Sequence, residues 1–173
     1  EKLGRRWLDN RASKLIEEDG SFSQYSLNYH RMVLDTFSIT EIWRMRLGRD
    51  GFSSVFYDRA SGATSWLYQM VCPLSGDGPN LGANDGSHLL QLTESCYRDF
   101  RPSVQLASNL FEGRLAYPNH GLWDTHLAWM GIVNKEKKPS QYVNCDYDSG
   151  GYKILRATDV NVIFRYPKCR YRP

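Results

Sequence analysis

The sequence lacks any uninterrupted apolar stretch that approaches the roughly 18 residues needed to cross a bilayer, so no membrane span is expected. It also lacks a Cys-x-x-Cys pair and any cysteine and histidine cluster with zinc spacing. Its four cysteines (Cys72, Cys96, Cys145 and Cys169) stand singly, which leaves free buried thiols and one or two disulfides both open. We therefore expect no metal and no cofactor.

A strong charge imbalance is missing as well. Lys and Arg total 22 against 19 Asp and Glu, which gives a formal net charge of +3. Nucleic-acid-binding domains gather Lys and Arg on one face, whereas the dense basic runs here are confined to residues 135–138, interpreted as a solvated loop, and 165–172. We expect no nucleic-acid partner. The small positive excess is compatible with an acidic substrate but does not require one.

Aromatic residues are abundant, with 5 Trp, 11 Tyr and 7 Phe. Two interpretations stay open for them. Aromatic side chains dominate many protein cores, and they also stack on sugar rings. Hydrophobic residues make up 41% of the chain, which is enough for a packed core.

The apolar spacing divides the chain into a helical part and a strand part. Helical periodicity continues to about residue 131, interrupted by a loop over residues 73–86 that is rich in Gly, Asn and Asp. Two β-rich segments follow, and Thr158 and Asp159 between them predict a hairpin. The expected helices span residues 2–18, 29–47, 53–70, 102–113 and 122–130, and the expected strands span 152–156 and 161–165.

A lone hairpin is only marginally stable in water. We therefore expect the sheet to continue beyond Pro173. The helical pattern starts at once, without the pattern of a signal peptide, so we also expect polypeptide before Glu1. The sequence is interpreted as part of a longer protein.

The segment from Glu18 to Arg31 is the most informative part of the sequence. It is a loop that leads into a predicted helix, and its Gln24, Asn28, Tyr29 and His30 are dense in hydrogen-bonding groups. The N-terminus of a helix favours an anion. The simpler alternative is a capped helix, with Ser26 or Asn28 as the cap and Tyr29 packed below it.

Four stretches resemble, in consistent order, the heparinase II/III-like polysaccharide lyases. The run DGSFSQYSLNYHRMVLDT is similar to the family's loop Asp-Gly-x-x-x-Glu/Gln-x-Ser-x-x-Tyr-His before a toroid helix. The runs PNLGANDGSHLLQL, YRDFRPSVQLASNLF and GGYKILRATDVNVIFRYPKCRYRP are similar to its Asn/Asp/Gly loop, its next helix and its opening sandwich strands. The resemblance implies a mainly α fold. Residues 1–135 would form the C-terminal part of an incomplete (α/α) toroid, and residues 141–173 the start of an antiparallel β-sandwich.

The resemblance also implies an activity. The family cleaves uronic-acid polysaccharides by β-elimination, and the Tyr that matches Tyr29 serves as general acid, or as acid and base together. The resemblance therefore implies an acidic polysaccharide as substrate and a periplasmic or secreted location. Within the family, the sequence is most similar to members associated with bacterial exopolysaccharide clusters. The Asn or His that polarises the sugar carboxylate would precede Glu1, and an assisting His would follow Pro173. The remainder of the same polypeptide is therefore an expected partner, since this chain alone would lack a complete catalytic set.

Further candidates for substrate binding have structural alternatives. Relatives often carry Glu where this chain has Gln24, which puts in doubt any role that needs a carboxylate there. His30 follows Tyr29 and points away from it on a helix, so structural hydrogen bonding is its alternative. For Asn84 and Asp85 the alternative is a tight turn. The residues predicted to contact substrate are Gln24, Asn28, His30, Asn84, Asp85 and Arg101.

Arginines at positions 98 and 101 could bind a uronate carboxylate through two hydrogen bonds. Asp99 lies between them, so a local ion pair is the alternative for both Arg98 and Arg101.

The run from Pro118 to His126 is interpreted as a turn into the fifth helix, although His120, Asp124 and His126 could instead bind a divalent metal. Two other functions stay open. One is a carbohydrate-binding or structural protein that has lost catalysis. The other is a glycoside hydrolase, which would need two carboxylates flanking one bond, with Asp85 and Asp124 as the candidates.

Overall fold

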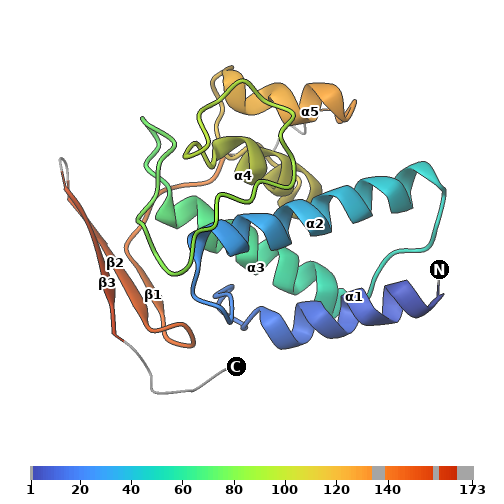
Figure 1. Ribbon diagram of the computed structural model, residues 1–173, viewed down its shortest axis with the longest axis horizontal. Helices are drawn as coiled ribbons and strands as arrows, with labels where there is room; N and C mark the ends of the chain where they lie inside the picture. Colours follow the sequence, from blue (N-terminus) through green and yellow to red (C-terminus); the bar gives the residue numbers. More distant parts are fainter. Residues whose placement is uncertain (1, 134–138, 158–159, 167–173) are drawn as a thin grey trace.

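The computed structural model describes residues 2–133, 139–157 and 160–166, which form a group of helices with a small sheet at one side (Figure 1). The helices are α1 (Lys2–Leu15), α2 (Leu27–Arg46), α3 (Ser54–Met70), α4 (Arg101–Ala107) with its π-helical continuation η1 (Ser108–Glu112), the 3-10 turn η2 (Leu122–Asp124) and α5 (Thr125–Trp129). The strands are β1 (Cys145–Tyr147), β2 (Tyr152–Arg156) and β3 (Asn161–Arg165), paired antiparallel in the order β1-β2-β3. Within the described ranges, no helix has the length and apolar content needed to span a membrane.

The mainly helical prediction is confirmed, and the two predicted strands have the predicted bounds. The basic run 135–138, the turn at Thr158 and Asp159, and Cys169 lie outside the described residues. The predicted first helix is three residues too long, because Ile16 leaves the helix to form a bridge with Phe22. Strand β1 was not predicted. The described helices and the three-stranded sheet establish neither a toroid nor a sandwich.

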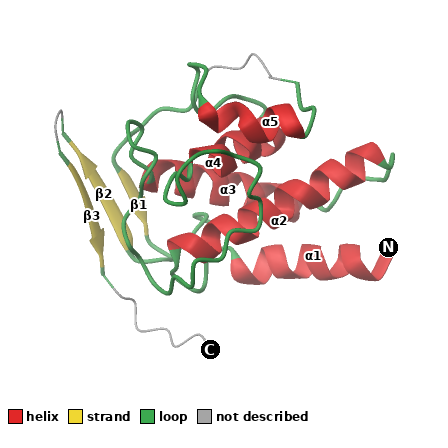
Figure 2. Ribbon diagram, turned by 45° about the horizontal axis from the view of Figure 1, so that its top comes forward, coloured by secondary structure: helices red, strands yellow, loops and turns green. Residues whose placement is uncertain are grey.

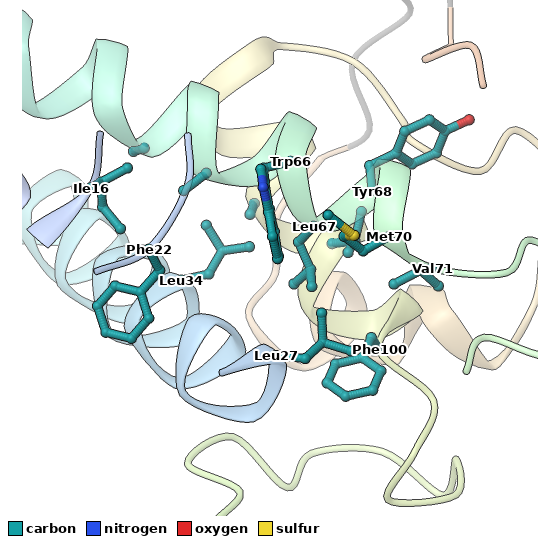
Figure 3. Close-up of a cluster of buried hydrophobic side chains, with 14 of the residues drawn as sticks. Ile16, Phe22, Leu27, Leu34, Trp66, Leu67, Tyr68, Met70, Val71 and Phe100 are labelled. Carbon is teal, nitrogen blue, oxygen red and sulfur yellow. The ribbon is translucent and has the colours of Figure 1, made fainter. Parts of the chain in front are cut away.

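The core lies between α2 and α3 (Figure 3). Leu34 of α2 and Leu67 of α3 are fully buried, and Trp66 of α3 is 2% exposed. Phe100, directly before α4, belongs to the same cluster. Burial of each such side chain contributes about 1.5–3 kcal/mol, so α2 and α3 form the rigid frame that carries the N-terminal end of α2.

The sheet packs against the same core through one face. Tyr152 and Ile154 of β2 are buried, and the Tyr152 ring meets Trp66 edge-on at 5.3 Å between ring centroids. Asp19, in the loop between α1 and α2, accepts a hydrogen bond from the Ser149 N–H at 2.7 Å. The sheet is therefore fixed to the loop that leads into α2.

That loop crosses α3 at two glycines. Gly20 has a φ of +85°, and a Cβ atom added there would lie 2.1 Å from the carbonyl oxygen of Gly62. The left-handed backbone and the close approach both require glycine.

We expect Gly20→Ala to lower the free energy of unfolding by at least about 2 kcal/mol, since a side chain at this φ is strained and the loop must also move off α3. Urea denaturation measures the loss. Gly4→Ala in α1 is the control, because nothing lies within 4 Å of its added Cβ; it should leave stability unchanged or raise it by up to about 1 kcal/mol. Equal stability of the two variants would contradict the prediction.

Candidate functional site

Ser26 caps the N-terminus of α2 and ties it to a distant loop. Its Oγ accepts a hydrogen bond from the Tyr29 N–H at 3.1 Å and donates one to the Ala83 carbonyl oxygen at 2.6 Å. Ser26 is extended, with φ −111° and ψ 128°, and the preceding Tyr25 has a left-handed φ of +54°. Of the two caps that the sequence left open, Ser26 is therefore the cap, and Asn28 lies inside the first turn.

Tyr29 lies in the first turn of α2, with its ring against the core and its hydroxyl at the surface. The hydroxyl donates a hydrogen bond to Asp85 Oδ2 at 3.1 Å. This bond, and the negative charge of Asp85, raise the pKa of the Tyr29 phenol. Hydrogen bonds from Ser87 lower the pKa of Asp85. At neutral pH the pair is a protonated phenol beside an ionised carboxylate.

The other exposed candidates lie in loops beside Tyr29. Asn84 and Asp85 belong to the long loop between α3 and α4, which crosses the N-terminal end of α2 (Figures 1 and 2). Each forms a tight turn: Asn84 Oδ1 accepts from the Gly86 N–H at 3.1 Å, and Asp85 Oδ1 from the Ser87 N–H at 3.0 Å. Gln24 is exposed in the loop before α2. The turn interpretation is confirmed for Asn84 and Asp85, and all three side chains remain open to a substrate.

Asn28 and His30 flank Tyr29 in the sequence but point into the protein. Asn28 is 2% exposed, and its Oδ1 accepts a hydrogen bond from Arg31 at 2.7 Å. The fully buried His30 ring stacks on Trp66 at 4.5 Å, and its Nε2 donates to the Ala63 carbonyl oxygen at 2.8 Å. Burial lowers the pKa of His30 to about 4. These positions argue against the substrate contacts predicted for both residues, and for His30 the structural alternative holds.

The guanidinium of Arg101 is occupied by a local ion pair. Its Nε and Nη2 donate to the two oxygens of Asp99 at 2.9 and 2.8 Å, and its Nη1 donates to two loop carbonyls. With these donors engaged, the predicted uronate contact of Arg101 is not supported. Arg98 differs from the expectation in another way, because it pairs with Asp77, at 2.6 Å, and not with Asp99.

The predicted turn before the fifth helix does not gather a metal site. His120 Nδ1 lies 3.2 Å from Asp124 Oδ2, whereas His126 is fully buried. Within the residues that the structure describes, no group of three His, Cys, Asp or Glu side chains could hold a metal ion. The hydrolase alternative required Asp85 and Asp124 to flank one bond. The carboxylate of Asp124 is hydrogen-bonded to His120 and Gln105. That of Asp85 is hydrogen-bonded to Tyr29 and Ser87, so the two carboxylates share no partner.

Two residues beside the site were missed from the sequence. Arg31 is fully buried in α2, and its Nη1 donates to the Tyr97 carbonyl oxygen at 2.6 Å. The Tyr97 hydroxyl donates in turn to Asn84 Oδ1 at 2.5 Å. A signal was present: Arg31 lies four residues after Leu27 and three before Leu34, on the apolar face of α2, where a charge needs partners.

The larger hollows described in the molecule lie elsewhere. One of about 340 Å³ lies between α1 and the C-terminal end of α2, lined by Leu8, Trp43 and Phe52 among others. A larger one, of about 490 Å³, lies along α1 and is lined by Leu3, Trp7 and Asn10 among others. Another, of about 270 Å³, lies between the end of α3 and the sheet. None of these three hollows is lined by Tyr29 or Asp85. Those two residues form a surface cluster with Asn84 and Tyr97.

This cluster offers a proton donor and an adjoining negative charge on a rigid helix end. Its function is therefore argued from the chemistry of these groups together with the motifs in the sequence. Comparison with protein-family models, curated proteins and solved structures gives no match for this chain.

Proposed function

We propose that this chain is part of a polysaccharide lyase that cleaves uronic-acid polysaccharide by β-elimination, with Tyr29 as the general acid. The observation that carries the proposal is the Tyr29 hydroxyl, which is held at the surface of the helix end and bonded to Asp85 at 3.1 Å. The sequence resemblance supplies the reaction. In this proposal the rest of the polypeptide completes an (α/α) toroid and a β-sandwich, and the protein acts in the periplasm or outside the cell.

The electrostatics favour the acid role over the base role. Because Asp85 raises the pKa of Tyr29, the phenol keeps its proton at neutral pH and can donate it to the departing glycosidic oxygen. A base role would require a lowered pKa, which a nearby cation would supply. The group that removes the C5 proton is therefore sought outside the Tyr29 and Asp85 pair.

The carboxylate of Asp85 also constrains how the substrate lies. A uronate carboxylate placed beside it would be repelled, since like charges at close range oppose each other. The sugar carboxylate must then face away from Asp85, toward groups that neutralise it. Arg165 of β3 is one exposed cation near the loop that precedes α2, with its guanidinium carbon 4.8 Å from the centre of the Tyr25 ring. In this proposal the other groups that neutralise the sugar carboxylate come from the rest of the polypeptide.

We expect the full-length protein to release products that absorb in the unsaturated-uronate band when it is incubated with acidic polysaccharides. Neutral polysaccharides should give no such product, because they have no carboxylate to make the C5 proton acidic. The measurement is absorbance with time across a panel of uronate-containing polymers. Reducing ends that appear without unsaturation would identify a hydrolase and contradict the proposal.

A binding protein without catalysis is the second candidate, and one observation favours it. Tyr29, Asn84, Asp85 and Tyr97 form a linked cluster of phenol, amide and carboxylate groups at the surface. Aromatic faces with a few well-placed polar groups also suit sugar hydroxyls without any bond cleavage. Binding on a glycan array without unsaturated product would select this candidate.

A further inference from the structure

Arg31 fixes the segment before α4 to helix α2. Its side chain is fully buried, and its two terminal nitrogens donate to Tyr97 O at 2.6 Å and to Asn28 Oδ1 at 2.7 Å. The rings of Tyr97 and Phe100 each lie 4.6 Å from the guanidinium carbon. A buried cation is stable only when such partners replace its water, so this attachment is specific.

Tyr97 connects the buried Arg31 to the exposed loop residue Asn84. Its carbonyl oxygen is bound to the buried Arg31, and its hydroxyl donates to Asn84 Oδ1 at 2.5 Å. The tight turns at Asn84 and Asp85 then orient the next side chain, so that Asp85 Oδ1 bonds to the backbone and Oδ2 faces Tyr29. A tyrosine has only two side-chain torsions, so this connection is stiff.

A second attachment holds the preceding residues of the same loop. The Leu27 N–H donates to Leu81 O at 3.1 Å, and Ser26 Oγ donates to Ala83 O. Between them, a Cβ at Gly82 would lie 2.5 Å from Tyr25 O. Residues 71–100 contain no helix or strand, and a loop of this length needs such attachments to hold one conformation. Two separate attachments therefore fix the residues that immediately precede Asp85.

We propose that Arg31 and Tyr97 are positioning residues that hold Asp85 at hydrogen-bonding distance from the Tyr29 hydroxyl. Their catalytic consequence rests on the proposed function of Tyr29 as proton donor. Their structural consequence does not, because the bond between Tyr29 and Asp85 can be observed without substrate. Arg31 and Tyr97 act through Asp85 and do not contact the reacting atoms.

The test is Tyr97→Phe, which removes one hydroxyl and keeps the ring over Arg31 and the bonded carbonyl. We expect the Tyr29 titration midpoint, followed by NMR of 13Cζ-labelled tyrosine in the full-length protein, to fall below that of the wild type. Tyr29→Phe identifies the resonance. Asp85→Asn removes the carboxylate charge and so gives the largest shift of the Tyr29 midpoint that loss of the Asp85 charge can cause. Tyr97→Phe should move the Tyr29 midpoint in the same direction.

Tyr166 provides a control in the same spectrum. Its hydroxyl donates to Asp148 Oδ1 at 3.1 Å, and this bond has no connection to Asn84. Its midpoint should be unchanged in Tyr97→Phe. An unchanged Tyr29 midpoint, or equal shifts of Tyr29 and Tyr166, would overturn the positioning role.

Activity separates the two proposals. Misplacement of a reacting group costs on the order of ten- to a hundredfold in turnover, so Tyr97→Phe should lower kcat by this factor with little change in KM. A shifted Tyr29 midpoint in a protein that forms no unsaturated product would support the positioning role and reject the lyase. Arg31→Lys, which keeps the charge but loses the two-pronged contact, should reproduce the Tyr29 shift. If that variant does not fold, Tyr97→Phe still decides.

Discussion

Tyr29→Phe is expected to slow the formation of unsaturated product by about 10²- to 10⁴-fold in the full-length protein, which is the usual contribution of a positioned general acid. The substitution removes only the hydroxyl that donates to Asp85 at 3.1 Å, and the ring keeps its place against the core. The departing glycosidic oxygen would then leave without a proton. Initial rates at saturating substrate measure the effect, and circular dichroism checks that the fold is intact.

Tyr166→Phe is the matched control for this experiment. Tyr166 also has a surface hydroxyl that donates to an aspartate, Asp148, at 3.1 Å. Desolvation, this hydrogen bond and the charge of Asp148 raise the pKa of Tyr166. The control loses the same kind of bond at the end of the sheet and should keep the wild-type rate. A wild-type rate in Tyr29→Phe, or an equal loss in both variants, would remove Tyr29 from the mechanism.

The helices and the hairpin could be predicted because their signals are local. The apolar spacing of α3 and the strong β preference of β2 and β3 specify those elements without help from the rest of the chain. Strand β1 has three residues, Cys145–Tyr147, which is too short to show alternation. It exists because β2 pairs with it, a contact between segments that spacing within one segment does not reveal.

The candidate site likewise has local features that the sequence predicts and long-range contacts that it does not. The motif around Tyr29 pointed to the hydroxyl, and the Asn and Asp pair at 84–85 was recognised as a second exposed group. Their meeting, across 56 positions of sequence, depends on the bonds that Ser26 and Arg31 make with the loop. Spacing contains no information about those bonds.

The burial of Asn28 and His30 has a simpler origin. Successive residues on a helix are rotated by about 100° from each other, so neighbours of an exposed Tyr29 can face the core. This rotation was the reason for the structural alternative offered for His30. No such alternative to substrate contact was offered for Asn28 beyond the helix cap, and residue type did not reveal its burial, because Asn is mostly exposed in proteins. The core accepts His30 in its neutral form, stacked on Trp66 and bonded to one carbonyl.

Asp35→Asn is expected to stabilise the protein by about 3 kcal/mol more at pH 7 than at pH 4. Asp35 is 1% exposed in α2, and burial raises its pKa to about 7, against the lowering effects of the Ser103 hydroxyl and the Arg31 guanidinium. In the unfolded chain an aspartate ionises near pH 3.9. As the pH rises from about 4 to 7, the unfolded state loses its proton, whereas the folded state keeps most of its own until the pH approaches 7, so the wild type loses stability. Because each state is about half ionised at one end of this range, the effective difference is about 2.4 pH units. At about 1.4 kcal/mol per unit this gives the expected difference, and an asparagine has no such cost.

Urea denaturation of both proteins at pH 4 and pH 7 measures this difference. Ser38→Ala is the control, since Ser38 is fully buried on the same helix and does not titrate, so its effect should be the same at both pH values. An asparagine variant that loses stability at pH 7 would show that native Asp35 is ionised and paired with Arg31, because removing one partner of a buried pair costs about 3–5 kcal/mol. Arg31 would then depend on Asp35 for its charge balance. The attachment of Tyr97, and with it the bond between Tyr29 and Asp85, should weaken in the same variant.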